Sequence, residues 1–378
     1  MNTAKFSPLG QRKRRPLRLR SELGELKLVL DYGQDRATGQ WGSPVRQAWG
    51  LVPHQKITPA LAEKLCFTVT ATGSYEEAAQ VASKWSARID DSTVHALVQR
   101  TGARAEELAQ ARYEQEPPER APQRQPSTLG VLMVDGCQVR HRGPGWGKKK
   151  TKQERAPWHE LKVGVFYRQE SSVQTEGGRG LLADKMVVSW TGEPMELGRR
   201  LNWEARREGL GRAENILFLG DGAAWVWNLQ QDRWPGAVGL LDFYHAGEHV
   251  WELGRAVAGE KPPALEQWVQ PRLHDLRHGR EQRVLGQMAR LKRRAGQAGK
   301  TIQREQNYFA THAGRMNYQE IARKGWPIGS GAVESACRQK QCRFKRCGQF
   351  WTGLGLRHLG ALDEARRNHH WDQLWTLN

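Results

Sequence analysis

The chain has 378 residues, with 59 Lys and Arg side chains against 40 Asp and Glu, and a formal net charge of +19. At roughly 100–200 residues per domain, this length predicts two or three domains, and the charge favours polyanions as partners over a merely solvated basic surface. No apolar run approaches the roughly 20 residues of a membrane span and no secretory leader is visible, so we expect a cytoplasmic protein with no membrane partner.

Residues 1–113 are expected to form a small, mainly helical DNA-binding module. Residues 1–20 are basic and predicted to be a disordered arm. Residues 25–32 alternate in polarity as a strand does, and residues 45–52 are predicted to return as a second strand, which would complete a hairpin.

Helical segments follow the hairpin. Thr58-Pro59 fits an N-cap followed by proline at the first helical position, and Ser74 with Glu77 fits the spacing of a capping box. A turn then leads to a helix at residues 92–100. The pair resembles a helix–turn–helix, whose second helix enters the major groove, although an ordinary helical bundle has the same pattern. The candidate DNA contacts in this module are Arg12, Lys13, Arg14, Arg15, Arg88, His95, Gln99 and Arg100.

A stretch rich in proline and charge, residues 114–128, is predicted to link this module to a second domain, residues 129–378. The second domain shows strand, strand, strand, helix, strand, helix and strand in that order, which is the order of an RNase H-like sheet. The strands are predicted at residues 131–134, 161–167, 186–190, 216–219 and 237–243, and the helices at 193–208 and 223–229. A long charged helical insertion at about 245–323 follows. We therefore expect an α/β protein with an RNase H-like catalytic core.

Three acidic residues occupy distinctive places in this domain. Asp135 ends the first predicted strand in VLMVDG, Asp221 ends the fourth in ILFLGDGAA, and Glu334 lies just inside a helix that opens at residues 329–331. A strand followed by Asp-Gly is often only a turn, but this joint placement predicts that Asp135 and Asp221 meet on neighbouring strands and that Glu334 reaches them. Carboxylates suit Mg²⁺ and Mn²⁺, and a pair of such ions can drive phosphodiester chemistry.

Basic residues follow Glu334 along its helix, where a backbone-holding role beside the cut phosphate competes with a solvated helix face. These candidates are Arg338, Lys340, Arg343, Lys345 and Arg346. A separate motif, His245-Ala-Gly-Glu248-His249, fits the inverted zinc-peptidase signature. A peptidase would give no role to the three acidic residues or to the basic charge. The five cysteines include no C-x-x-C pair, so we expect reduced thiols.

On these residues the chain resembles bacterial DDE-type insertion-sequence transposases of the ISKra family, which are related to the Mutator-like group. The matching segments are DYGQDRATGQWGSP near the start, MVDG at Asp135, LGDGAAW at Asp221, DFYHAGEHVW at Asp242, LRHG at residues 276–279 and WPIGSGAVES at Glu334. Some relatives carry a cysteine cluster that binds zinc near the N-terminus, and this chain lacks it.

The resemblance implies a metal-dependent transposase acting on double-stranded DNA near the bacterial nucleoid. Asp135, Asp221 and Glu334 would hold two Mg²⁺ or Mn²⁺ ions, and His245 in the D-x-x-H motif would contact the scissile phosphate, orient a water or make only a structural hydrogen bond. The enzyme would cut transposon ends and join the 3′-hydroxyl to target DNA, as a homodimer or larger synaptic complex. An inactive or domesticated relative acting as a DNA-binding regulator is the alternative, and a zinc peptidase using His245, Glu248 and His249 is the remote one.

Overall fold

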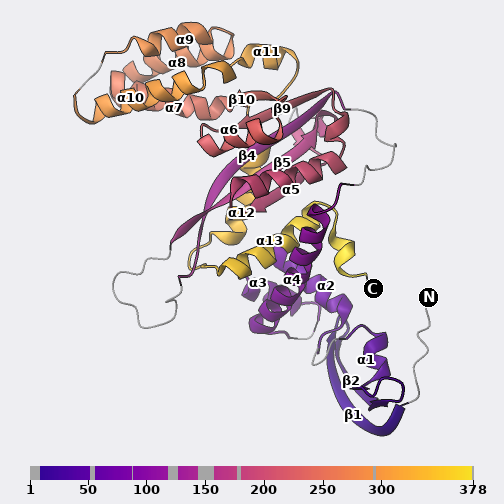
Figure 1. The fold of residues 1–378 in the computed structure, drawn as a ribbon. Coiled ribbons are helices and arrows are strands. Elements are labelled where there is room, and N and C mark those ends of the chain that lie inside the picture. The colour runs from indigo at the N-terminus through magenta and orange to yellow at the C-terminus, as the bar shows by residue number, and fades with distance from the viewer. Residues whose placement is uncertain are drawn as a thin grey trace. The chain divides into compact units, whose positions relative to one another are not determined.

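The computed structural model describes residues 9–51, 56–86, 88–117, 127–143, 157–176, 180–292 and 295–376 (Figure 1). The chain divides into two compact units. The first comprises Met1–Ala111, Arg140–Pro157 and Cys342–Asn378, and the second comprises Arg112–Val139 and Trp158–Gln341. These units do not follow the predicted boundaries, because the C-terminal segment clusters with the N-terminal residues. Most of the predicted linker, residues 118–126, lies outside the described residues, as do residues 1–8 of the predicted arm.

The first unit begins with a long hairpin. Strand β1 (Leu9–Ser21) pairs antiparallel with β2 (Gly24–Asp35), which itself pairs with the short β3 (Trp41–Gly42). The disordered arm predicted for residues 1–20 is therefore wrong from residue 9 onward. Its basic residues alternate with Leu17 and Leu19, and this two-residue period suits a strand. The strand predicted at 45–52 is also wrong, because Pro44 starts the short helix α1 (Pro44–Ala48).

Four longer helices complete the described part of the first unit: α2 (Pro59–Ala71), α3 (Tyr75–Ala82), most of α4 (Asp91–Tyr113) and α13 (Gly353–Arg367). Both predicted N-cap residues are confirmed, although the Glu77 side chain of the predicted capping box accepts its hydrogen bond from the Gly73 amide and not from that of Ser74. Thr58 Oγ1 accepts a hydrogen bond from the Leu61 amide, and Ser74 Oγ accepts one from the Glu77 amide at 3.0 Å. The connection between α3 and α4 spans residues 83–90, which is longer than the three or four residues of a helix–turn–helix.

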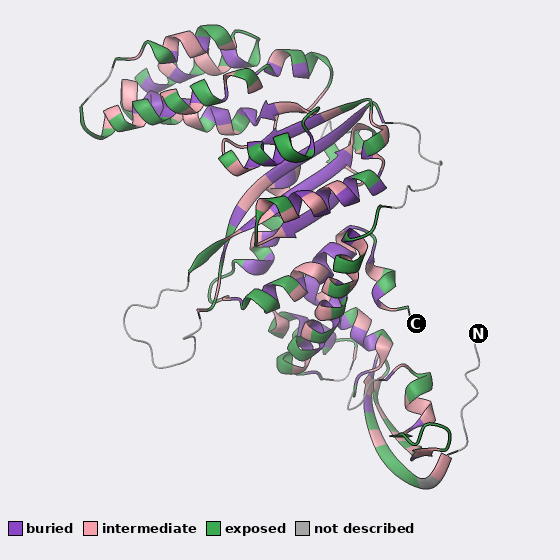
Figure 2. Ribbon diagram, in the orientation of Figure 1, coloured by how far each residue is buried: buried purple, intermediate pink, exposed green. Residues whose placement is uncertain are grey.

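The second unit contains a mixed five-stranded sheet in the order β10-β9-β4-β5-β8. Its strands are β4 (Leu129–Arg140), β5 (Trp158–Arg168), β8 (Met186–Trp190), β9 (Asn215–Gly220) and β10 (Val238–Leu241). β4, β9 and β10 run parallel, whereas β5 and β8 are antiparallel. The apolar runs predicted as strands all lie in this sheet, and Figure 2 shows its strands largely buried, as sequence runs without polar alternation require.

Helices cover the sheet and extend from it. α5 (Pro194–Arg207) packs on β5 and β8, and α6 (Ala224–Arg233) packs on β9. The insertion consists of α7 (Phe243–Ala258), α8 (Ala264–Arg277), α9 (Glu281–Ala289), α10 (Gly296–Thr311) and α11 (Tyr318–Arg323), which confirms its helical character. α12 (Gly331–Phe344) then carries Glu334. Two short strands, β6 (Ser172–Gln174) and β7 (Gly180–Leu182), pair separately. Among the described helices none has the length and apolar character needed to cross a membrane.

Candidate functional site

Three aspartates lie next to one another where the parallel pairing of β4, β9 and β10 ends. Val134 of β4 pairs with Gly220 of β9, and Gly220 pairs with Leu241 of β10. The residues that follow this row are Asp135, Asp221 and Asp242. Carboxyl ends of parallel strands are where open α/β sheets place their ligand sites. The sequence predicted this meeting for Asp135 and Asp221 but did not include Asp242 among the site residues.

One detail of the prediction is wrong. Asp135 does not end its strand, because β4 continues through Arg140. Beyond Asp135 the strand alternates, with Cys137 and Val139 buried and Gln138 exposed. The apolar run therefore marks only the part of β4 that lies between two neighbouring strands and is buried on both faces.

Asp242 joins the helix carrying Glu334 to the end of the sheet. Its side chain is 2% exposed. Oδ1 accepts a hydrogen bond from the His245 amide at 2.6 Å, which caps α7, and Oδ2 accepts one from the Ser330 amide. Ser330 Oγ in turn donates to Glu334 Oε1 at 3.1 Å. The buried Asp242 carboxylate thus fixes the starts of α7 and α12. Glu334 is held in turn by its hydrogen bond from Ser330.

These side chains line an open cavity of about 440 Å³ within the second unit. All four residues that the sequence assigned to catalysis border it: Asp135, Asp221, His245 and Glu334. Asp242, Tyr244 and Ser330 are among the lining residues that the sequence did not assign to the site. Asp242 carried the same signal as the other aspartates, since it follows an apolar run, whereas Tyr244 and Ser330 carried no signal except their proximity to motif residues.

The electrostatics of the cavity favour a cation. Burial raises the pKa of Asp135, and the nearby charge of Asp221 raises it further, while hydrogen bonds from the Gly136 amide and Cys337 act in the opposite direction. Asp221 Oδ1 accepts a hydrogen bond from the Ala223 amide at 2.9 Å. The charge of Asp221 disfavours ionisation of the Asp135 carboxyl, and a bound cation would favour the ionised form of Asp135.

The donor set fits Mg²⁺ or Mn²⁺ in kind but is not preassembled. Carboxylate oxygens are the ligands these ions prefer, and the cavity offers Asp135, Asp221 and Glu334. Within the described residues, however, no three His, Cys, Asp or Glu side chains are grouped as a metal site. Glu334 Oε1 and Asp135 Oδ1 both make hydrogen bonds inside the protein. These bonds leave the second oxygen of each carboxylate for a metal, but the three side chains would have to come closer together to share one ion.

The histidine pair on α7 is arranged poorly for zinc. His249 Nδ1 lies 2.6 Å from Glu305 Oε2, and its ring stacks on Tyr308 at 3.6 Å between centroids. His245 Nδ1 lies 3.7 Å from Glu248 Oε2 on the same helix. A histidine held by a carboxylate is common in zinc sites, but no third ligand joins this pair in the described part of the chain.

The predicted DNA contacts of the first unit divide by exposure. Exposed members are Lys13, Arg14, Arg15, Arg88, His95, Arg100, Lys345 and Arg346, while the side chain of Arg12 lies outside the described residues. Arg346 pairs with Glu77 at 3.0 Å, and Gln99 is half-buried with Oε1 2.9 Å from His358 Nδ1. Arg343 is only 6% exposed and donates from Nε and Nη1 to the Val69 and Gly73 carbonyls, so its assignment to the phosphate backbone of duplex DNA is wrong.

The two candidates on α12 within the second unit also differ. Arg338 is exposed. Lys340 is 1% exposed and donates a hydrogen bond to Ser189 Oγ of β8 at 3.0 Å. Its assignment to the phosphate backbone is therefore wrong, because the side chain ties α12 to the sheet instead.

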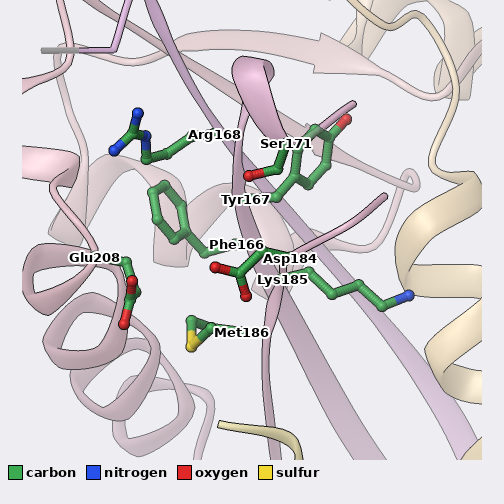
Figure 3. A pocket seen from close by; sticks show the side chains of 8 residues that line it. All are labelled: Phe166, Tyr167, Arg168, Ser171, Asp184, Lys185, Met186 and Glu208. Carbon is green, nitrogen blue, oxygen red and sulfur yellow. The ribbon is translucent and has the colours of Figure 1, made fainter. Parts of the chain in front are cut away.

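A second cavity of the same unit is too small for a substrate. It lies where β5 ends and β8 begins, and Figure 3 shows the side chains around it: Phe166, Tyr167, Arg168, Ser171, Asp184, Lys185, Met186 and Glu208. Its volume of about 10 Å³ matches roughly one water molecule. Of these two cavities, the carboxylate-lined one is the candidate functional site.

Comparisons with known proteins identify no family for this chain. No family model matches the sequence, and no curated protein matches it. Among solved structures, one similar chain belongs to the Drosophila P element transposase strand transfer complex. The two share 9% sequence identity with a TM-score of 0.26, over 83% of this chain and 79% of that one. A TM-score this low carries no argument, so the interpretation of the site rests on its own geometry.

Proposed function

We propose that this chain is a DDE transposase of the ISKra type, which cuts DNA at insertion-sequence ends and joins the freed 3′-hydroxyl to target DNA. One observation carries the proposal. Asp135 and Asp221 follow paired residues of neighbouring parallel strands, and Glu334 of α12 borders the same open cavity of about 440 Å³. This is the placement that the sequence motifs predict for a phosphodiester site.

The sheet supports the same proposal. In its order, β10-β9-β4-β5-β8, the central strand is β4, which comes first in the chain. The parallel strands β9 and β10 lie on one side of β4, and β5 and β8 lie on the other. That arrangement agrees with an RNase H-like core. In this proposal the insertion formed by α7 to α11 separates the second aspartate from the glutamate.

The chain's own residues would divide the work of the reaction. Asp135, Asp221 and Glu334 would hold the divalent ions. Asp242 would keep Glu334 in place through Ser330, and α7 in place through the His245 amide. Bound Mg²⁺ or Mn²⁺ would supply activation of the attacking oxygen and stabilisation of the leaving oxygen. His245, on the first turn of α7, is about half-exposed at the cavity and is available to donate a hydrogen bond to a DNA phosphate.

The partners follow from the charge. With a net charge of +19 and exposed basic residues in both units, double-stranded DNA is the proposed substrate, and binding would depend strongly on salt. Joining two transposon ends requires at least two copies of the chain, so we propose a homodimer or larger synaptic complex. A DNA-binding regulator would use the same basic surface but would have no use for the carboxylates around the cavity.

A cleavage assay tests the proposal against its alternatives. Purified full-length chain is incubated with duplex DNA carrying the element's ends, with and without Mg²⁺ or Mn²⁺, and the products are mapped by their 3′ termini. The transposase proposal expects metal-dependent breaks at the ends that Asp135→Asn abolishes while DNA binding persists. Binding without cleavage in the presence of either metal would favour the regulator. One zinc per chain, lost in both His245→Ala and His249→Ala, would favour the peptidase.

A further inference from the structure

The first unit contains a cavity of its own, separate from the proposed catalytic residues. Its volume is about 380 Å³, within the range of roughly 300–1,000 Å³ of small-molecule sites. It lies among the start of α3, the first half of α4 and the segment that leads into α13. The polar and aromatic side chains that line it include Tyr75, His95, Gln99, Arg343, Phe350 and Trp351.

A buried cation that forms no direct ion pair with a described carboxylate lines this cavity. Arg343 is 6% exposed, and it makes no ion pair with a described carboxylate. Its Nε and Nη1 atoms donate to backbone carbonyls at 3.0 and 3.2 Å, while Nη2 is buried with no hydrogen-bond partner among the described residues. Burial lowers the pKa of the guanidinium, with the charge of Arg346 adding to the effect and the Tyr75, Asp363 and Glu77 groups opposing it. Leaving such a donor unpaired is costly, and a ligand acceptor would remove that cost.

Two further polar side chains, those of Tyr75 and Gln99, line the same cavity. Tyr75 Oη and Gln99 Nε2 are buried, and neither has a hydrogen-bond partner of normal geometry within the described residues. Burial raises the pKa of Tyr75, and the nearby Gln99 amide acts in the opposite direction, so the two groups lie close to each other. The other amide atom of Gln99, Oε1, lies 2.9 Å from His358 Nδ1, which orients the amide so that Nε2 remains as a donor. Arg343, Tyr75 and Gln99 therefore place buried polar atoms without a well-formed hydrogen bond beside one cavity, and small shifts of these side chains would satisfy them with a ligand rich in acceptor atoms.

The remaining walls are aromatic. Tyr75, Phe350 and Trp351 border the cavity together with the imidazole of His95, whose ring meets Tyr75 edge to face at 5.1 Å. Aromatic side chains offer flat surfaces on which a nucleobase packs, and acceptor edges of bases and phosphates suit arginine and amide donors. Arg142 lines the cavity as well and is exposed, which adds positive charge for a phosphate at its mouth.

We propose that this cavity binds one nucleotide, with its base among the aromatic side chains and its acceptor atoms on Arg343 Nη2, Gln99 Nε2 and Tyr75 Oη. The nucleotide is either a free mononucleotide or an unpaired nucleotide of a DNA strand, since both present the same chemistry. The proposal does not depend on the catalytic role of the second unit, because none of its residues borders the carboxylate-lined cavity.

Titration calorimetry on the full-length chain tests the proposal with three variants. Arg343 is unsuitable, because its other nitrogens hold the end of α2 and its loss would disturb the fold. Tyr75→Phe removes only an unpartnered hydroxyl, so folding should survive, and nucleotide binding should weaken by about three- to tenfold. Gln99→Glu keeps an oxygen for His358 but replaces the donor with an anion, so binding should fall by more than about tenfold. The matched control is Tyr318→Phe, which removes another buried unpartnered hydroxyl from the second unit.

The probes are deoxyadenosine 5′-monophosphate, deoxyadenosine, inorganic phosphate and a single-stranded oligonucleotide. Mononucleotide binding that weakens in Tyr75→Phe and Gln99→Glu but not in Tyr318→Phe supports a free nucleotide as the ligand. The same pattern for the oligonucleotide alone supports an unpaired nucleotide of a strand. Phosphate or deoxyadenosine binding as tightly as the nucleotide would overturn the proposal. So would binding of every probe that the cavity variants leave unchanged, or no binding of any probe.

Discussion

Replacing Asp242 should destabilise the second unit by an amount that depends on how many of its two hydrogen bonds survive. Asp242→Asn keeps Oδ1 for the His245 amide but turns an NH₂ group toward the Ser330 amide, so one charge-assisted bond is lost. Such bonds contribute about 1.5–3 kcal/mol. Asp242→Ala also removes the cap of α7, which adds about 0.5–2 kcal/mol. The expected losses are therefore about 1.5–3 kcal/mol for Asp242→Asn and about 2–5 kcal/mol for Asp242→Ala.

Urea unfolding gives the free-energy change, and amide hydrogen exchange locates it. Only Asp242→Ala should lose protection at the start of α7, because Asp242→Asn keeps the cap. Protection at residues 330–340 should fall in Asp242→Asn as much as in Asp242→Ala, because both lose the bond to Ser330. Asp232→Asn is the matched control, since Asp232 is half-exposed and pairs only with its neighbour Arg233 at 3.0 Å. Asp242→Asn within about 0.5 kcal/mol of the wild type, which is the usual range of a surface substitution, would refute the bridging role.

Three other predictions concern surface charge, pH and packing. Arg338→Gln should reduce the slope of log affinity against log salt for duplex DNA by about 0.9, because Arg338 is exposed. Lys340→Met should leave the slope unchanged, because the Lys340 side chain is buried. Filter binding at several salt concentrations measures both slopes, and an equal change in the two variants would contradict the assignment of Arg338 to the DNA surface. Burial raises the pKa of Glu305, but hydrogen bonds from its histidine and arginine partners outweigh this and hold the pKa below its ordinary value of 4.5. The resulting stability is present above about pH 4.5 and lost as pH falls through the lowered pKa, so unfolding curves of wild type and Glu305→Gln should converge in acid; a constant difference would contradict this. Gly102→Ala would place a Cβ 2.5 Å from the His358 carbonyl oxygen, so it should lower the free energy of unfolding by about 1–3 kcal/mol. Gly360→Ala has open space around its Cβ and should be neutral or stabilising. Thermal unfolding compares the two, and similar effects of both would refute the close packing of α4 on α13.

Local patterns were sufficient for much of the fold. Apolar runs located every strand of the mixed sheet, and cap residues located the starts of α2 and α3, because both signals depend on neighbours in sequence. The strand ends also placed Asp135 and Asp221 in one cavity. In β1 the many basic residues are also typical of an exposed, disordered arm, so the alternation of Leu17 and Leu19 with arginine is easily overlooked as the sign of a strand.

Other features depend on contacts between distant residues and left no local signal. Lys340 and Arg343 lie in a basic helical stretch that looks solvated, and only their partners on β8 and α2 show that they are buried. The clustering of residues 342–378 with the N-terminal residues depends on packing across hundreds of positions. Ser330 gained a place in the site only because the Asp242 side chain reaches its amide.

The most direct test of the account compares four carboxylates around one cavity. Asp135→Asn, Asp221→Asn, Glu334→Gln and Glu248→Gln each replace a carboxylate by an amide of the same size, and all four residues border the cavity. Cleavage of transposon-end DNA is measured with Mg²⁺ for each variant, with duplex binding measured beside it. The account predicts that the first three variants lose cleavage and keep binding, while Glu248→Gln, whose side chain is 76% exposed, cuts at nearly the wild-type rate. Near wild-type cleavage by any of the first three would contradict the assignment of that residue.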